Sequence, residues 1–318
     1  MLTNEFVIYC CFTLIVNAFL AVPLINFLYN HRFYKTKETG NVDTSRRNNL
    51  WYDHLGNTLN TPSSFGVLLV VSMLLFGISS FIYEYSNSFT ILLVAFLILL
   101  LSGLWDDCEK YFLYLKNKRW GLRIRHKLAL QFFAVGLYVF FTYGASYLTP
   151  FILLALVFVL NAYNITDGLD GLIGGISIPA FLAFSVIEYV TFGFTGFSLL
   201  YATILGFLVV FHYFNIKPAR VWLGDAGALP LGLIFGICFL RYPFYVTLPI
   251  SFLIIFEGFS SALQLLAIGL FKKKVFVIAP FHLLLLNKGW VDTKIVQRAQ
   301  LIQHILCIGA LLIFLLFR

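Results

Sequence analysis

Long, unbroken apolar runs are the feature that most constrains the fold of this chain. Hydrophobic residues make up 60% of its 318 residues, whereas charged residues make up only 11%. A soluble domain typically carries about 25% charged residues, so this chain has too few charges to cover a water-exposed globular surface. Runs of about 20 apolar residues cross a bilayer as helices. The chain is therefore predicted to be an all-α polytopic membrane protein.

Ten apolar runs are long enough, or nearly long enough, to cross the membrane. They do not alternate between polar and apolar residues, so they are expected to be helices and not barrel strands. The fifth and eighth are short for a full span. No shift in composition marks a second domain, so residues 1–318 are expected to form one membrane-embedded unit. The expected spans are 6–28, 65–83, 88–105, 128–148, 150–163, 172–190, 196–214, 227–240, 244–270 and 299–317.

The distribution of Lys and Arg predicts the orientation of these helices. All but two of the 22 basic residues fall in alternate connections, and the exceptions are Arg241 and Arg318. Connections rich in Lys and Arg face the cytoplasm, so both termini are expected on the extracytoplasmic side. The net charge of +8 thus reflects topology and affinity for anionic lipid headgroups. It does not indicate nucleic-acid binding.

Five aspartates lie at the ends of predicted helices, all on the predicted cytoplasmic side. Asp106 and Asp107 end the third span, Asp167 and Asp170 follow the fifth, and Asp225 opens the eighth. A single acid in such a place is as readily a helix cap or a solvated helix end as a functional group. Carboxylates gathered together need a cation or shared protons. We expect the five to surround one Mg²⁺ ion, with Mn²⁺ as the other suitable metal.

Basic residues beside these acids indicate a partner that carries phosphate. Lys110, Arg123 and Lys127 lie in the connection that follows the first acid pair, and their side chains suit phosphate or sugar oxygens. Magnesium also favours phosphate partners. These features predict a cleft on the cytoplasmic face where a nucleotide diphosphate meets a phosphorylated lipid. A cation transporter is the competing interpretation, although its acids would lie nearer the bilayer centre.

Four sequence blocks carry a resemblance to a known enzyme family. They are WDDCEK followed by GLRIRHK, NAYNITDGLDGL, FNIKPARVWLGDAGALPLG, and KKKVFVIAPFHLLLLNKGW. They resemble motifs of the polyprenyl-phosphate N-acetylhexosamine-1-phosphate transferases, a group of glycosyltransferase family 4 type, and most of all its muramoyl-pentapeptide branch. The resemblance implies magnesium-dependent transfer of phospho-MurNAc-pentapeptide from its UDP carrier to undecaprenyl phosphate, with release of UMP. It also implies a bacterial plasma-membrane protein of peptidoglycan synthesis, and suggests a homodimer.

The resemblance further implies roles for individual residues. Asp106 and Asp107 match paired acids near the lipid phosphate and Asp225 matches the magnesium ligand, so these three are the expected catalytic residues. Trp222 matches an aromatic residue that stacks on uracil, with an interfacial belt residue as the alternative. Direct attack and a covalent intermediate both stay open. The expected substrate-binding residues are Lys110, Lys127, Asn161, Asn164, Asp167, Asp170, Asn215, Trp222, Gln264 and His282.

One block departs from the family pattern. The usual Pro-Ile-His-His-His-Phe-Glu reads PFHLLLL here, from Pro280 to Leu286, so that of the three histidines His282 alone is kept. Glu257, an acid in the ninth run, has no role in the resemblance. Three interpretations stay open: a transferase with a divergent donor pocket, a sister transferase that uses another UDP-sugar such as UDP-GlcNAc, and a non-catalytic transporter or scaffold.

Overall fold

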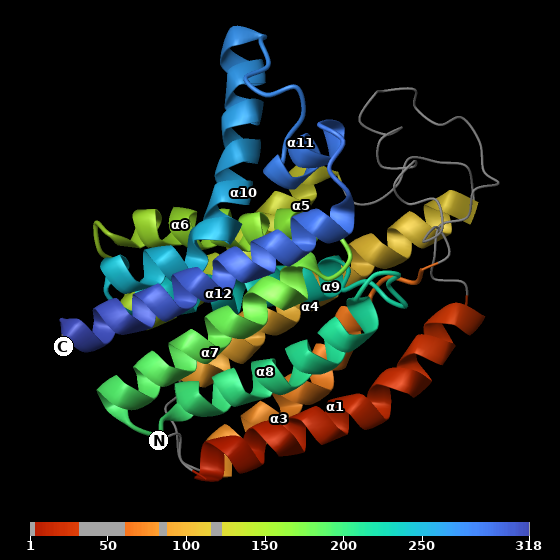
Figure 1. Ribbon diagram of the computed structural model, residues 1–318. Helices are drawn as coiled ribbons and strands as arrows, with labels where there is room; N and C mark the ends of the chain where they lie inside the picture. Colours follow the sequence, from red (N-terminus) through yellow and green to blue (C-terminus); the bar gives the residue numbers. More distant parts are fainter. Residues whose placement is uncertain (1–3, 32–60, 83–87, 116–122, 318) are drawn as a thin grey trace.

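Helices make up the fold, and the described part of the chain contains no strand (Figure 1). The computed structural model describes residues 4–31, 61–82, 88–115 and 123–317. The elements are α1 (Asn4–Asn30), η1 (Phe65–Leu68), α3 (Leu69–Ile82), α4 (Ser88–Leu115), α5 (Ile124–Tyr143), α6 (Thr149–Thr166), α7 (Leu172–Phe192), α8 (Gly196–Asn215), α9 (Asp225–Arg241), α10 (Phe244–Phe271), α11 (Phe281–Asn287) and α12 (Asp292–Leu316).

Each of the ten predicted spans overlaps a helix in the described residues, but some bounds differ: α4 continues to Leu115, ten residues past the predicted end, and α12 begins at Asp292, seven residues before the predicted start. Nine helical stretches there are long and apolar enough to cross a membrane, with η1 and α3 counted as one continuous stretch. The remaining run, the eighth, is α9, which has 17 residues and is buried along most of its length. A helix of about 20 residues is needed to span the hydrocarbon core. α9 is therefore a short central helix, packed against α4 and α6.

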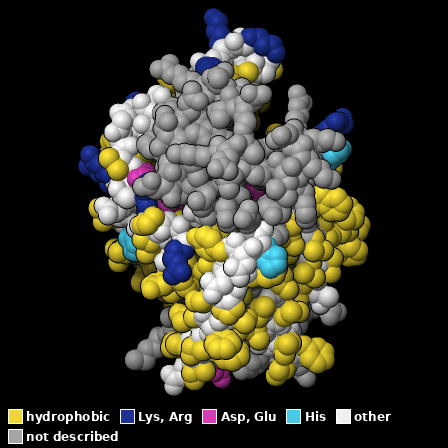
Figure 2. All heavy atoms as spheres, turned by 90° about the vertical axis from the view of Figure 1, so that its right-hand side faces the viewer, with side chains coloured by type: hydrophobic (Ala, Val, Ile, Leu, Met, Phe, Trp, Pro, Cys, Tyr) yellow, Lys and Arg dark blue, Asp and Glu magenta, His cyan; other side chains and the backbone are white. Residues whose placement is uncertain are grey.

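Burial separates inner helices from outer ones. Most of α7 and α8 is buried, whereas α1 and α12 expose most of their length. The exposed side chains on the outer helices are large and apolar, as at Phe19 and Leu312, which is expected where lipid is the solvent. Figure 2 shows a broad hydrophobic area of this kind over the lower part of one face.

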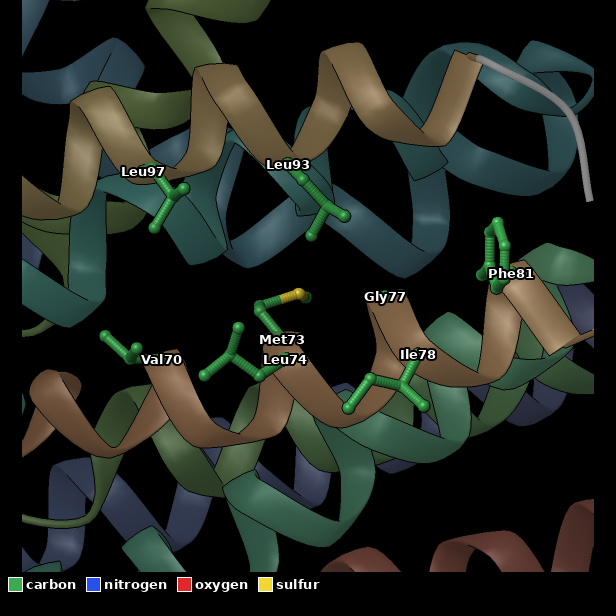
Figure 3. A pocket seen from close by; sticks show the side chains of 8 residues that line it. All are labelled: Val70, Met73, Leu74, Gly77, Ile78, Phe81, Leu93 and Leu97. Carbon is green, nitrogen blue, oxygen red and sulfur yellow. The ribbon is translucent and has the colours of Figure 1, made fainter.

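An open apolar groove lies between α3 and α4. Its volume is about 370 Å³. In Figure 3, Leu93 and Leu97 of α4 point across it toward Met73 and Gly77 of α3. All its lining residues are apolar and many of them, such as Phe81, are exposed. The groove is therefore part of the lipid-facing surface and contains none of the predicted site residues.

Close backbone contacts bring the second half of α4 and the start of α9 together. A Cβ on Gly103 would lie 2.3 Å from the carbonyl oxygen of Asp225, and one on Gly66 would lie 2.1 Å from the nitrogen of Gly227. The segment before η1 also pairs with the segment before α9, since Trp222 N donates to Pro62 O at 2.8 Å. Three distant parts of the chain thus meet at one end of the bundle.

Candidate active site

Asp107 binds the first turn of α9. Its Oδ1 accepts a hydrogen bond from the backbone N–H of Asp225, and its Oδ2 accepts one from Ala226, both at 3.3 Å. The hydroxyl of Ser64 also donates to Oδ2, at 3.0 Å. The first N–H groups of a helix have no partner within it, and its dipole favours negative charge there. Asp107 therefore fixes where α9 begins, and with it the position of Asp225.

Gly224, immediately before α9, is required by this arrangement. Its φ is 73°, in the left-handed region, and a Cβ there would lie 2.4 Å from Oδ2 of Asp107. Glycine adopts positive φ at little cost and leaves room for close approach. The contact explains why a glycine precedes the aspartate that the resemblance assigns to magnesium.

Asp225 is the centre of a polar cluster formed by four helices. Lys127 of α5 donates to its Oδ2 at 2.5 Å and lies 3.6 Å from Oδ2 of Asp106, which lies inside α4 and not at its end as predicted. Asn164 of α6 donates to Oδ1 at 2.8 Å. Asp106 and Asp107 are both buried. The structure thus brings together the three predicted catalytic acids and two predicted substrate-binding residues.

Asp170 and Asp167, in the turn after α6, have different surroundings. Asp170 holds the segment before α9, because its carboxylate accepts hydrogen bonds from Ala219 N at 3.1 Å and from the indole N–H of Trp222 at 3.0 Å. The carboxylate of Asp167 accepts no hydrogen bond from a described residue. Removal from water, together with the charges of Asp225, Asp170 and Asp107, raises the pKa of Asp167 well above its usual range.

Asn161 lies deeper in the bundle than Asn164. Its amide donates to Gln131 Oε1 and to the carbonyl oxygen of Val157, both at 2.8 Å. Gln131 is fully buried, and its amide nitrogen has no hydrogen-bond partner among the described residues. This pair continues the polar face of α5 and α6 inward from Lys127.

Asn215 braces the turn that carries Asp170. Its Oδ1 accepts a hydrogen bond from Gly171 N at 2.9 Å, and its Nδ2 donates to Val221 O at 3.0 Å. The side chain is buried. Both ends of this amide are therefore engaged by backbone groups of the two segments that form the site.

Gln264 has a comparable bracing role in α10. Its Oε1 accepts hydrogen bonds from Val275 N and Phe276 N, and its Nε2 donates to Phe276 O at 2.9 Å. It therefore holds the return segment after α10. His282, at the start of α11, is buried and bonded to Glu257 of α10. Lys110 belongs to α4, but its side chain lies outside the described part of the structure.

The expected gathering of five aspartates around one cation is not seen in the described residues. Within the described residues, no three Asp, Glu, His or Cys side chains form a group that could hold one metal ion. The expectation that all five aspartates surround a single cation is therefore wrong for these residues. Their carboxylates are spread over bonds to the start of α9, to Lys127 and to Trp222. Asp106 and Asp225 come nearest to the expected arrangement, since Lys127 contacts both.

Two residues of this site were not predicted from the sequence. Ser64 binds Asp107, and Gln131 binds Asn161. Gln131 had a usable signal, because it lies four residues after Lys127 and so on the same face of a helix. Ser64 lies between two predicted spans, where nothing local indicates which acid it would meet.

The comparisons with known proteins agree with this geometry. Residues 89–242 match the family described as glycosyl transferase family 4. Three relatives are named phospho-N-acetylmuramoyl-pentapeptide-transferase. That of Aliarcobacter butzleri is 32% identical over 289 residues, 79% of this chain and 80% of the relative. The relative from Thermotoga neapolitana is 33% identical over 252 residues, which cover 74% of this chain and 79% of the relative. The relative from Enterococcus faecalis is 29% identical over 256 residues, which cover 74% of this chain and 78% of the relative.

These matches and the all-helical membrane fold define a class, the membrane-embedded phosphoglycosyl transferases. The chain belongs to glycosyl transferase family 4 and is an enzyme of that class. The nine candidate spans among the described residues, together with the relatives, make it a multi-pass membrane protein. The non-catalytic transporter or scaffold is thereby set aside.

Proposed function

We propose that this enzyme transfers phospho-MurNAc-pentapeptide from its UDP carrier to undecaprenyl phosphate, with UMP as the leaving group. The observation that carries the proposal is the cluster in which Lys127 contacts both Asp106 and Asp225, next to the start of α9. The relatives' shared name supports this donor. The excess of Lys and Arg in alternate connections supports a bacterial plasma-membrane protein whose site opens to the cytoplasm.

Positioning and electrostatics are what phosphoryl transfer needs from a protein. Lys127 is held between two carboxylates, so its ammonium group stays where phosphate oxygens of the two substrates would meet. A phosphate monoester loses its second proton near pH 6, so the acceptor is already a dianion at neutral pH and needs no strong base. In this proposal Asp106 and Asp107 therefore orient Lys127 and the start of α9.

The residues at this site fit a magnesium ion of the kind that binds phosphates. Such an ion takes one or two protein carboxylates and fills its other positions with water and substrate oxygens, so a cage of several acids is unnecessary. Asp225 would hold it, with Asp106 as the second carboxylate. When bound, the ion would neutralise charge on the diphosphate. Lys127 and Asn164 donate to the two oxygens of Asp225, so they would share this carboxylate with the ion.

Trp222 is the residue proposed to recognise the uracil base. Asp170 accepts a hydrogen bond from its indole N–H, which fixes the orientation of the ring. The ring is half-buried, so part of its surface is left for a stacked base. Loss of the Asp170 contact would free the ring and weaken binding of the UDP donor.

A sister transferase that uses another UDP-sugar is the second candidate, and one observation favours it. Leu283 and Leu286 stand where the family pattern has a histidine and an acid, and both are buried in a small apolar cluster with Ile278 and Ile295. The usual polar groups of this loop are thus replaced by packing. A donor that needs fewer polar contacts than phospho-MurNAc-pentapeptide would fit such a loop.

Release of UMP tests the proposal directly. Purified enzyme is incubated with Mg²⁺, undecaprenyl phosphate and either UDP-MurNAc-pentapeptide or UDP-GlcNAc, and UMP and lipid-extractable sugar are both measured. Product from the muramoyl donor alone supports the first candidate, and product from UDP-GlcNAc alone supports the second. Absence of UMP with both donors would contradict both.

A further inference from the structure

Glu257 is a buried acid for which the proposed mechanism has no use. It lies within α10, where its neighbours are apolar, and it is 8% exposed. A carboxylate within a membrane helix is costly and needs a partner. Its side-chain partner among the described residues is His282, at the start of α11. The two are 25 positions apart in the chain, so their pairing is a product of the tertiary fold.

The geometry of this pair fixes the histidine ring. Glu257 accepts hydrogen bonds from the backbone N–H of His282 at 3.1 and 3.3 Å, and its Oε2 lies 3.2 Å from Nδ1. An ionised carboxylate only accepts hydrogen bonds, so this network assigns the proton to Nδ1. The other ring nitrogen, Nε2, has no hydrogen-bond partner among the described residues.

Nε2 lies against the turn that carries Asp167 and Asp170. A Cβ on Gly168 would be 2.4 Å from Nε2 of His282 and 2.8 Å from Cε1, so glycine is needed for this approach. The next residue, Leu169, packs on the apolar cluster that contains Leu283. α11 therefore contacts two consecutive residues of the turn, one through the imidazole ring and one through its leucines.

We propose that Glu257 is a positioning residue that orients His282 and, through Nε2, the turn at 167–171. This inference deepens the proposed function and rests on it for its activity measurement. The usual histidine block ends in an acid. Leu286 occupies that position here and is buried in the apolar cluster. Glu257 supplies a carboxylate to the one histidine that remains. Its effect on turnover passes through His282, because its carboxylate is bonded to His282 and not to Asp167, Asp170 or Trp222.

A double-mutant cycle tests this coupling. Glu257→Gln is expected to lower kcat per folded molecule between about 10- and 100-fold, the range for groups that orient a functional side chain. Glu257→Asp is expected to recover part of the loss. In the His282→Ala background, adding Glu257→Gln is expected to change kcat less than about twofold, because residues that act through one another are not additive. Additive losses would overturn the proposal.

Hydrogen exchange gives a measurement that does not depend on activity. Glu257→Gln is expected to speed amide exchange in a peptide that covers the turn at 167–171, because the turn loses its support from α11. Glu188→Gln is the matched control, since Glu188 is another buried membrane glutamate and lies far from the turn. It is expected to destabilise the fold as a whole while leaving unchanged both the local opening that governs exchange in the turn and kcat per folded molecule.

The two measurements separate failure of the inference from failure of the proposed function. If the wild-type enzyme released no UMP from either donor, the proposed function would fail, and the exchange rates alone would decide the inference. Unchanged exchange in the turn together with unchanged kcat in Glu257→Gln would overturn it. Equal loosening of the turn in Glu257→Gln and Glu188→Gln would also overturn it, because that result indicates general destabilisation.

Discussion

The two ends of α9 hold buried charge in opposite ways. α9 begins with Asp225 and ends with Arg241, about 24 Å away at about 1.5 Å per residue. At the Arg241 end, Glu188 of α7 is fully buried and accepts four hydrogen bonds. Two come from Arg241, at 2.8 Å each, and two from Tyr242 and Thr195, at 2.6 Å each. The guanidinium group also lies 3.8 Å from the ring of Phe197.

The charged groups at the Asp225 end of α9 are arranged differently. Several carboxylates gather there, and Lys127 is the described cation that pairs with Asp106 and Asp225. Asp167 accepts no hydrogen bond from a described residue, and its pKa is raised by burial and by neighbouring acids. At the Arg241 end the described residues pair one glutamate with one arginine, whereas at the Asp225 end several carboxylates lie close to one another. A structural ion pair needs no ligand, whereas carboxylates held together favour a cation.

Of the substitutions at the two ends of α9, Asp225→Ala is expected to have the largest effect on activity. Loss of the carboxylate removes the partner of Lys127 and the proposed metal ligand, so UMP release should fall by about 10³-fold or more. The measurement is UMP formed per folded enzyme. Glu5→Gln, an exposed acid in the first turn of α1, is the matched control and should have full activity. Turnover of Asp225→Ala equal to that of the control would contradict the assignment of the site.

Glu188→Gln tests the other end of α9. Removing one charge of a buried pair leaves Arg241 unpaired, so the free energy of unfolding should fall by about 3–5 kcal/mol. Thermal unfolding in detergent should show a lower Tm, with kcat per folded molecule unchanged. A fall in kcat with no change in Tm would mean that this end of the helix takes part in the reaction.

Lys127→Gln should have an intermediate effect. It removes the cation between Asp106 and Asp225, so kcat/KM should fall by about 10²-fold, comparable to loss of one preorganised electrostatic contact. Lys127→Arg retains the charge with a different shape and should lose less. Steady-state kinetics with the UDP-sugar varied would check both. Equal losses in the two variants would show that geometry, and not charge, is what the site needs here.

Asp167→Asn should have the smallest effect on stability, and its sign depends on pH. The folded state raises the pKa of Asp167, so folding favours the protonated acid. The stability gained in this way is fully present below the usual pKa of about 4, and it is lost as the pH rises through the pKa that Asp167 has in the folded state. The Tm of Asp167→Asn should therefore rise relative to wild type between pH 4 and pH 8. A constant difference in Tm over that range would show that Asp167 does not titrate in this way.

Much of the fold was predictable because membrane helices are encoded locally. The ten apolar runs became ten described helices, and α9 was already short as a run at 227–240. The position of Asp225 at the start of a helix was also visible, whereas Asp106 and Asp107 were predicted to end a helix and lie inside α4, which continues to Leu115. The different structural roles of the polar residues were not visible in the sequence. Asp107 caps α9, Asp170 holds Trp222, and Asn215 braces backbone, and each of these bonds joins residues distant in the chain.

The amino-acid sequence by itself determined that this chain lives in a bilayer and roughly where its membrane helices lie along the chain, although the helix ends differ by up to ten residues from those predicted. A backbone in lipid must satisfy its hydrogen bonds within each helix, so a long apolar run leaves little choice. Which carboxylate meets which partner was decided by the tertiary structure. The pairs Glu188–Arg241 and Glu257–His282 and the contact of Gly224 with Asp107 all depend on how helices pack, and packing brings together side chains that no local pattern relates.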